Sequence, residues 1–412
     1  MKLLWLVLLS FFIMGCEDMI ELEKQSYVIA VGIDETEQEG IFLFTFQIAN
    51  PEVGSIASSV GSEQEASETV TIRGTDIMTA TTTANAFVTK QIALDQTRVI
   101  IASESLARSD QFIRIIQSAG RTPQIRRSVQ LIISQEDAAT FIKNNQPTLE
   151  QRPHKYYQYM LTRAKETGII PDADLHRFFQ ITEGDADLFL AMYATTNTDP
   201  KIDRGSEDNF YAGQIPKSGG NPTQFMGSAV FKEGIMIDRL TGEETRIANI
   251  LDKTMEMSEL LTTYPDPLAP KYRVAADYIQ SQEPIIDIQY DAERNHATIN
   301  VLVQFEIEIL AIPSLVNYSQ SEADKATLEK SIEDYNEAIT KELIKKTQES
   351  YRAQPFYWSL YARKHFKDIP AFEQADWNKN IYPNADIHVS YQLKKMQFGN
   401  LLDDTNLNEV RD

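Results

Sequence analysis

Cysteine is almost missing from this sequence, which contains only one, Cys16. A single cysteine cannot form a disulfide within the chain, so the fold must rest on hydrophobic burial. A chain of 412 residues is long enough to bury one or more cores. Its 42% hydrophobic residues and ordinary amounts of glycine and proline are typical of a globular protein.

Positive charge is also scarce. The 39 Lys and Arg residues stand against 60 Asp and Glu residues, which gives a formal net charge of −21. Nucleic-acid binding requires a basic surface stripe, whereas this sequence offers only short basic clusters such as Arg126-Arg127. We therefore expect no nucleic-acid partner. An anionic bilayer would also repel such a chain, so membrane attachment would need a tether.

The motifs of metal and cofactor sites are missing as well. The sequence has no HExxH or CxxC motif, no nucleophile elbow, and no Gly-rich loop placed to bind phosphate. No metal-ligand spacing relates the five histidines, which are His154, His176, His296, His365 and His388. We expect neither a metal nor a cofactor.

Paired carboxylates are the one catalytic pattern that occurs. Asp185 with Asp187, or Glu243 with Glu244, has the residue types of a glycosidase. So acidic a chain contains such pairs by chance, however, and nothing else in the sequence singles them out. We therefore expect a protein that binds or scaffolds a partner and is not an enzyme.

Long hydrophobic runs are limited to the first residues. The run from Leu3 to Met14 is too short for a transmembrane helix, which needs about 20 apolar residues. With Lys2 before it and Glu17 and Asp18 soon after it, the run is typical of a secretory signal peptide. We expect residues 1–15 to be removed.

The end of this segment, Ile13-Met14-Gly15-Cys16, resembles the lipobox of bacterial lipoproteins. The Cys16 thiol would accept a diacylglyceryl group, and two acyl chains suffice for stable anchoring at about 0.8 kcal/mol per buried methylene. This predicts a chain that is lipid-anchored on the outer face of the cytoplasmic membrane. In the alternative interpretation, Cys16 is only a small residue near an ordinary cleavage site.

Hydrophobic periodicity predicts strands that alternate with helices up to about residue 193, which favours a mixed α/β (α+β) fold. Residues 54–68 are predicted to form an exposed loop. The predicted strands are residues 27–34, 40–48, 70–73, 99–102 and 129–134, and the predicted helices are residues 75–90, 109–119, 135–145 and 156–166. Two further apolar segments, residues 175–182 and 188–193, follow without an assigned type.

A polar stretch at residues 195–223 then indicates a domain boundary. Later segments predict a hairpin (227–231 and 234–237), a helix (242–254), two paired strands (285–290 and 297–309), an amphipathic helix (322–350) and a strand (387–393). The apolar stripe of the long helix either packs on its own sheet or seats a partner helix. We expect three small domains, each a β-sheet with packed helices, at residues 16–200, 201–270 and 271–412.

Four internal motifs carry a family resemblance. They are Ala30-Val31-Gly32-Ile33-Asp34, the segment 98–107 (RVIIASESLA), the segment 121–129 (RTPQIRRSV), and the pair 227–232 (GSAVFK) with 240–245 (LTGEET). With Cys16 before them, they resemble, in order, the Ger(x)C family, the lipoprotein C subunits of nutrient germinant receptors. Gly32 is read as serving a tight exit from its strand, and residues 242–245 as a turn and helix cap.

The resemblance implies a three-domain mixed α/β protein without known catalysis. It would assemble with two integral membrane subunits, A and B, in the inner spore membrane and be required for germination. For Arg126 and Arg127 two interpretations stay open, a contact with another subunit or simple surface charge. At residues 17–19 the chain has Glu-Asp-Met where the family often has an aromatic and then basic residues.

Two other functions compete with this interpretation. A solute-binding lipoprotein of a transporter would have two similar doubly wound lobes joined by a hinge. An anchored hydrolase of the cell wall or spore cortex would use one of the carboxylate pairs.

Overall fold

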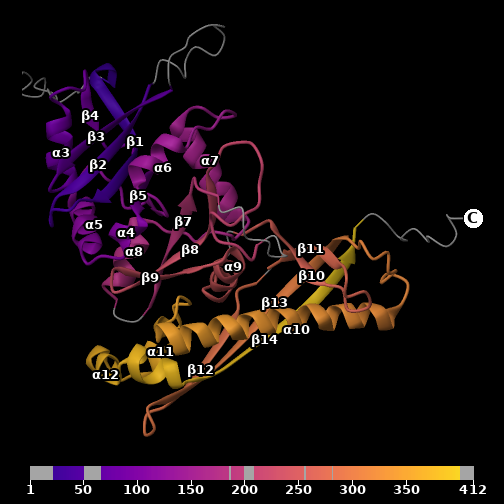
Figure 1. Ribbon diagram of the computed structural model, residues 1–412. Helices are drawn as coiled ribbons and strands as arrows, with labels where there is room; N and C mark the ends of the chain where they lie inside the picture. The colour runs from indigo at the N-terminus through magenta and orange to yellow at the C-terminus, as the bar shows by residue number, and fades with distance from the viewer. Residues whose placement is uncertain are drawn as a thin grey trace, which may run out of the picture.

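The computed structural model describes residues 22–50, 66–184, 187–198, 208–254, 257–280 and 282–399. The signal peptide predicted at residues 1–15 and the lipidation site Cys16 lie outside these ranges, as do most of the loop predicted at 54–68 and the tail after Asn400. The described chain forms two β-sheets with packed helices, which confirms the predicted mixed α/β class (Figure 1). None of the described helices is both long enough and apolar enough to span a membrane.

The first sheet has nine strands in the order β3-β2-β1-β5-β6-β7-β8-β9, with β4 paired to β1. The centre of this sheet is parallel. Strand β1 pairs in parallel with β4 and β5, β5 with β6, and β6 with β7. The two predicted hairpins, β1–β2 and β8–β9, are antiparallel and extend it. The strands are β1 (Gln25–Glu35), β2 (Phe42–Ala49), β3 (Ser67–Gly74), β4 (Gln91–Ala93), β5 (Val99–Ser103), β6 (Gln130–Ser134), β7 (Phe189–Thr195), β8 (Gln224–Lys232) and β9 (Ile235–Leu240).

Helices connect these strands and cover the sheet. Their bounds are α3 (Ile77–Ala84), α4 (Glu104–Ala107), α5 (Gln111–Arg121), α6 (Ala138–Asn144), α7 (Pro153–Glu166) and α8 (Leu175–Thr182). Helix α3 is shorter than the predicted helix 75–90, because the chain turns after Ala84 and then forms β4.

Gly32 lies inside β1 and lets α6 approach the sheet closely. A Cβ atom there would come within 3.0–3.2 Å of Ile142, Thr45 and Ala138 side-chain atoms. The expectation that Gly32 serves a tight exit from the strand was wrong, since β1 continues to Glu35.

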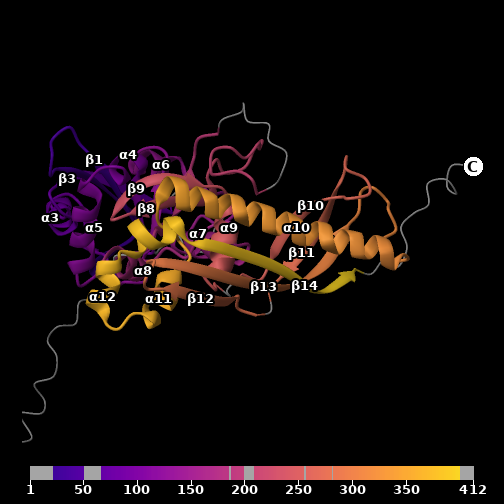
Figure 2. The ribbon, with the colours of Figure 1, turned by 90° about the horizontal axis from the view of Figure 1, so that it is seen from below.

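The second sheet is built around β13 (His296–Ala311), which pairs antiparallel with β11 (Arg273–Ile279) and β12 (Ile285–Asp291) and parallel with β14 (Asp386–Phe398). Strand β10 (Leu260–Pro265) pairs with β11. Helix α10 (Glu322–Lys346) runs along β14 (Figures 1 and 2) and buries Leu328, Ile332 and Leu343. Its apolar stripe therefore faces its own sheet.

Strands β7 and β8 of the first sheet contribute side chains to two hydrophobic cores. Phe189, Ala191 and Phe231 lie in the first core, whereas Leu190 and Val230 lie in the core of the second sheet. Helix α9 (Gly242–Leu251) follows β9, and α11 (Trp358–Ala362) and α12 (Ile369–Ala375) follow α10. Strands β8 and β9 thus continue the first sheet across the boundary expected at residue 200, while the division into three domains stays a prediction.

Candidate functional site at the junction of the two sheets

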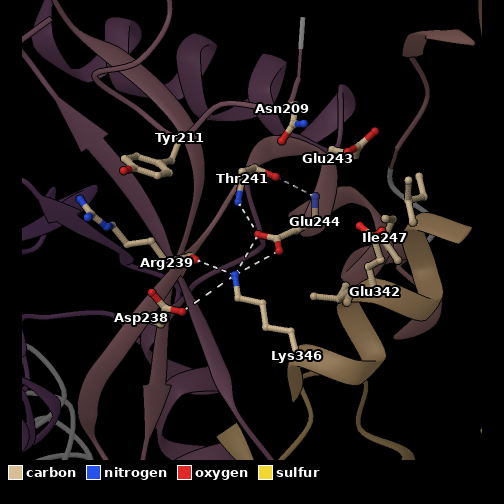
Figure 3. Close-up of a pocket in the computed structure, with 12 residues that line it drawn as sticks. Asn209, Tyr211, Asp238, Arg239, Thr241, Glu243, Glu244, Ile247, Glu342 and Lys346 are labelled. Atoms are coloured by element: carbon tan, nitrogen blue, oxygen red, sulfur yellow. Dashed lines mark hydrogen bonds and ion pairs between the residues drawn. The ribbon is translucent and has the colours of Figure 1, made fainter. Parts of the chain in front are cut away.

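A polar pocket of about 400 Å³ lies where α10 meets β9 and the start of α9 (Figure 3). Part of the motif at residues 240–245 lines this pocket, together with side chains of α10 about 100 residues later in the chain. The lining residues are Asn209, Tyr211, Asp238, Arg239, Thr241, Glu243, Glu244, Ile247, Ile339, Glu342, Leu343 and Lys346.

Lys346, on the last turn of α10, is the central cation of this pocket. Its Nζ lies 3.0 Å from Oε1 and 3.3 Å from Oε2 of Glu244, and 3.9 Å from Oδ2 of Asp238 (Figure 3). It also donates to the backbone carbonyl of Arg239 at 3.4 Å. The Tyr351 hydroxyl donates to Asp238 at 2.6 Å. These contacts fasten the end of α10 to the first sheet.

Glu244 has a second role, because it closes a capping box at the start of α9. Its Oε2 accepts a hydrogen bond of 3.0 Å from the Thr241 amide, and the Thr241 hydroxyl accepts one of 3.2 Å from the Glu244 amide. This exchange satisfies backbone donors that a helix start leaves unpaired. The predicted turn and helix cap at residues 242–245 is confirmed.

Glu243 points to a different partner on α10. The Tyr335 hydroxyl donates a hydrogen bond of 2.9 Å to Glu243 Oε1. Burial raises the pKa of the Glu243 carboxyl despite this bond, and burial together with Glu243 raises the pKa of Tyr335 to about 12. One turn further along α9, the guanidinium of Arg246 forms a buried ion pair with Asp208. Both members of the Glu243–Glu244 pair are thus engaged with side chains of α10.

Arg239 connects the pocket to the motif at residues 98–107. Its guanidinium lies 4.4 Å from the Tyr211 ring centroid and donates to the Tyr193 hydroxyl at 2.9 Å. That hydroxyl donates to Glu104 at 2.5 Å. Asp238, Arg239 and Lys346 were not identified as site residues from the sequence. Lys346 did carry a signal, because it lies three residues after Leu343 and therefore on the same face of the helix as the apolar stripe.

A second contact between the sheets involves Asp187. Its carboxylate accepts a hydrogen bond of 2.5 Å from Ser359 and another from the Gln354 amide, and the Leu188 amide donates to the Gln354 carbonyl at 2.9 Å. Burial raises the pKa of Asp187 to about 7. Asp185, its partner in the carboxylate pair considered from the sequence, lies outside the described residues.

Within the described ranges, no three His, Cys, Asp or Glu side chains are grouped so that they could hold a metal ion. The polar side chains of the junction are engaged with one another in hydrogen bonds and ion pairs. The arrangement is suited to holding two sheets in a fixed relation.

Arg126 and Arg127 lie elsewhere, at the start of β6, and neither lines the pocket. Both are exposed. The Arg127 guanidinium lies 4.9 Å from the ring centroid of Phe179, and its carbonyl accepts a hydrogen bond of 3.0 Å from the His176 amide. Their contact with another subunit stays a prediction.

Comparison with known proteins identifies the family. A model described as the spore germination protein N-terminal domain matches residues 18–195, and one described as spore germination B3/GerAC-like, C-terminal, matches residues 226–399. The crystal structure of the GerBC protein is similar to this fold with a TM-score of 0.51 and 15% sequence identity, covering 93% of this chain and 100% of that chain. No curated protein matches significantly. The chain therefore belongs to the GerAC-like family of spore germination proteins, the germinant receptor C subunits that its motifs resemble.

Proposed function

We propose that this chain is the lipid-anchored subunit of a nutrient germinant receptor and that it works through contacts with two integral membrane subunits. The observation that carries the proposal is the family match, which begins at residue 18, two residues after Cys16, and extends to residue 399 with one gap. A lipobox directly before the family's N-terminal domain is the arrangement that an anchored extracytoplasmic subunit requires.

The junction supports a role in binding over catalysis. Its carboxylates Glu243, Glu244 and Asp187 are engaged by Tyr335, Lys346 and Ser359, so they stabilise structure. The architecture also counts against a solute-binding protein. The centre of the first sheet is parallel, whereas the second is mostly antiparallel, so the two are not similar doubly wound lobes.

The test is a Cys16→Ala substitution in the native strain, with membrane retention and nutrient-triggered germination measured together. We expect the protein to leave the membrane fraction and the nutrient response to weaken, because an alanine cannot accept the diacylglyceryl group. Asp18→Ala is the matched control and should change neither. Normal retention and germination of the Cys16 variant would refute the lipid anchor.

A further inference from the structure

One edge of the first sheet gathers the starts of its parallel strands. Gln25 of β1 pairs with Gln91 of β4, Ala30 of β1 with Val99 of β5, and Val99 with Gln130 of β6. Parallel strands enter a sheet from the same edge, so the segments before these strands lie on one side of the molecule. Strand β4, which marks this edge, lies far from the second sheet (Figure 1). We call this side the entry edge.

Cations precede the strands at the entry edge. Lys90 comes directly before β4, Arg98 directly before β5, and Arg126 and Arg127 shortly before β6; the three arginines are exposed. Their backbones are close, because the Arg98 amide donates to Ile29 and the Gln130 amide donates to the Arg98 carbonyl. A chain of net charge −21 therefore presents exposed arginines together at one place.

The start of α7 adds to this charge. Burial, and then the charges of Arg152 and Lys155, lower the pKa of His154 in the first turn of α7. Acidic groups also occur at the entry edge, namely Glu23, Asp95, Glu150 and Asp174, the last of which is bridged to Gln130 at the start of β6. Glu150 forms an ion pair with Arg152, whose Nε lies 2.7 Å from its Oε1, so these two charges cancel and Lys155 is the cation that α7 adds.

Two large apolar side chains in the connections that lead to β4 and α7 face water. Phe87, between α3 and β4, is 59% exposed, and Leu149, in the connection between α6 and α7, is fully exposed. Bulky apolar residues beside basic ones are the composition of surfaces that bind anionic lipid, since the cations attract the headgroups and the apolar groups enter the interface.

The tether fixes which surface lies near the membrane. Five residues lie between Cys16 and Leu22, where the described chain begins, and the six Cα-to-Cα steps span only about 20 Å even when fully extended. A lipid on Cys16 therefore keeps the start of β1 close to the bilayer, and with it the entry edge.

We propose that the entry edge lies on the bilayer, with Arg98, Arg126 and Arg127 contacting anionic phospholipid headgroups and with Phe87 and Leu149 entering the interface. This orientation rests on the lipid anchor of the proposed function. The family often has an aromatic residue and then basic residues after its cysteine, whereas this chain has Glu17, Asp18 and Met19, and the entry edge supplies positive charge in their place.

The experiment uses the mature chain, residues 16–412, with Cys16→Ser so that no lipid contributes. Binding is measured by co-sedimentation with vesicles of phosphatidylglycerol and phosphatidylcholine, and with vesicles of phosphatidylcholine alone. We expect binding to the anionic vesicles only, against the sign of the net charge, and its loss at high salt. The variant R98E/R126E/R127E should bind the anionic vesicles at least tenfold more weakly.

The matched control is K330E/K341E/K345E, which changes the charge equally at exposed positions of α10 and should bind like the parent chain. Thermal unfolding of each variant checks that the fold is kept, and F87S/L149S should weaken binding without a change of charge. Absence of binding by the parent chain, or equal loss in the control, would overturn the proposal.

Two further outcomes separate this proposal from others. If R98E/R126E/R127E keeps vesicle binding but no longer co-purifies with the integral membrane subunits, these arginines serve subunit docking and the lipid contact is refuted. Failure of the Cys16→Ala test in cells concerns the anchor alone, because the vesicle assay contains no lipidated protein.

Discussion

Lys346 Nζ lies 3.0 Å from Glu244 Oε1, and this ion pair joins the last turn of α10 to the first turn of α9. The same carboxylate accepts the Thr241 amide and thereby caps α9. One side chain thus stabilises a helix locally and a junction between distant segments, so substitutions can separate the two roles.

We expect Lys346→Met to lower the free energy of unfolding by about 1–2 kcal/mol, because it leaves a half-buried carboxylate without its cation. Lys345→Met is the control. Lys345 is two-thirds exposed and lies 3.9 Å from Glu349, and such surface pairs contribute about 0–1 kcal/mol. Urea unfolding of the two variants provides the comparison, and equal effects would show that Lys346 does not hold the junction.

Glu244 should respond in a graded way. Glu244→Gln retains a side-chain oxygen that can accept the Thr241 amide but loses the charge, so we expect an effect similar to that of Lys346→Met. Glu244→Ala loses the cap as well and should cost about 1 kcal/mol more. In a double-mutant cycle, Glu244→Gln and Lys346→Met should be less than additive. Additivity would mean that the two side chains are not coupled.

Asp34, from the motif at residues 30–34, caps a helix that begins 104 residues later. Its Oδ1 and Oδ2 accept hydrogen bonds of 2.6 and 3.0 Å from the Ala138 and Ala139 amides at the start of α6. The side chain of Asp137, the N-cap residue of α6, makes no hydrogen bond to the helix start. We expect Asp34→Ala to lower stability by about 2–3 kcal/mol, since it leaves buried donors unpaired. Asp137→Ala should cost under about 0.5 kcal/mol, and thermal unfolding that ranks the two in reverse would contradict this assignment.

The fold could be predicted where hydrophobic alternation is strict. In β13 the residues at every second position from Ala297 to Ile309 are buried, and this strand was predicted almost to its ends. Strands β10 and β11 were missed. Pro265 ends β10, further prolines follow it, and the alanines of β11 give almost no contrast between its two faces. Their place is set by pairing with β13, which is information that local sequence does not contain.

The site could be predicted only in its local part. Thr241 and Glu244 form a capping box and are three residues apart, so this motif can be recognised directly in the sequence. The partners Lys346 and Tyr335 come from α10, and no spacing rule relates them to α9. The sequence contains one signal, for Lys346: it lies on the same helix face as Leu343 in the apolar stripe, where a lysine can reach a half-buried partner.

Asp187 makes stability depend on pH around neutrality. Burial raises its pKa from the ordinary value of 3.8 to about 7. Between these values the folded protein keeps a proton that the unfolded chain releases, so the stability from this group is full below about pH 4 and is lost as the pH rises to about 7. At about 1.4 kcal/mol per unit of pKa, the loss amounts to at most about 4 kcal/mol.

Asp187→Asn removes this titration. We expect the difference in unfolding free energy between the parent and the Asn variant to move in favour of the variant as the pH rises from 4 to 7, and to stay constant above about pH 8. Urea unfolding across this range measures it. Asp110→Asn, at the exposed position directly before α5, is the control variant. A difference independent of pH would show that Asp187 is ionised throughout.

Strand β14 is an edge strand, and α10 protects it with two glutamates one turn apart. Glu337 accepts a hydrogen bond of 3.1 Å from the Tyr391 amide, and Glu333 accepts one of 2.8 Å from the Leu393 amide. Exposed strand edges pair with other chains, and natural proteins cover them to prevent aggregation. These carboxylates occupy backbone donors that another strand would otherwise use.

Glu333→Ala with Glu337→Ala should therefore have two effects. We expect stability to fall by about 1–3 kcal/mol, because two hydrogen bonds to charged acceptors are lost. We also expect aggregation to increase at temperatures below the unfolding transition, since the amides of Tyr391 and Leu393 become available to a second chain. Circular dichroism follows unfolding and light scattering follows aggregation during the same thermal scan, and Glu329→Ala on the same helix is the control. If the double variant unfolds earlier but stays monomeric until it unfolds, the glutamates stabilise the fold without guarding the edge.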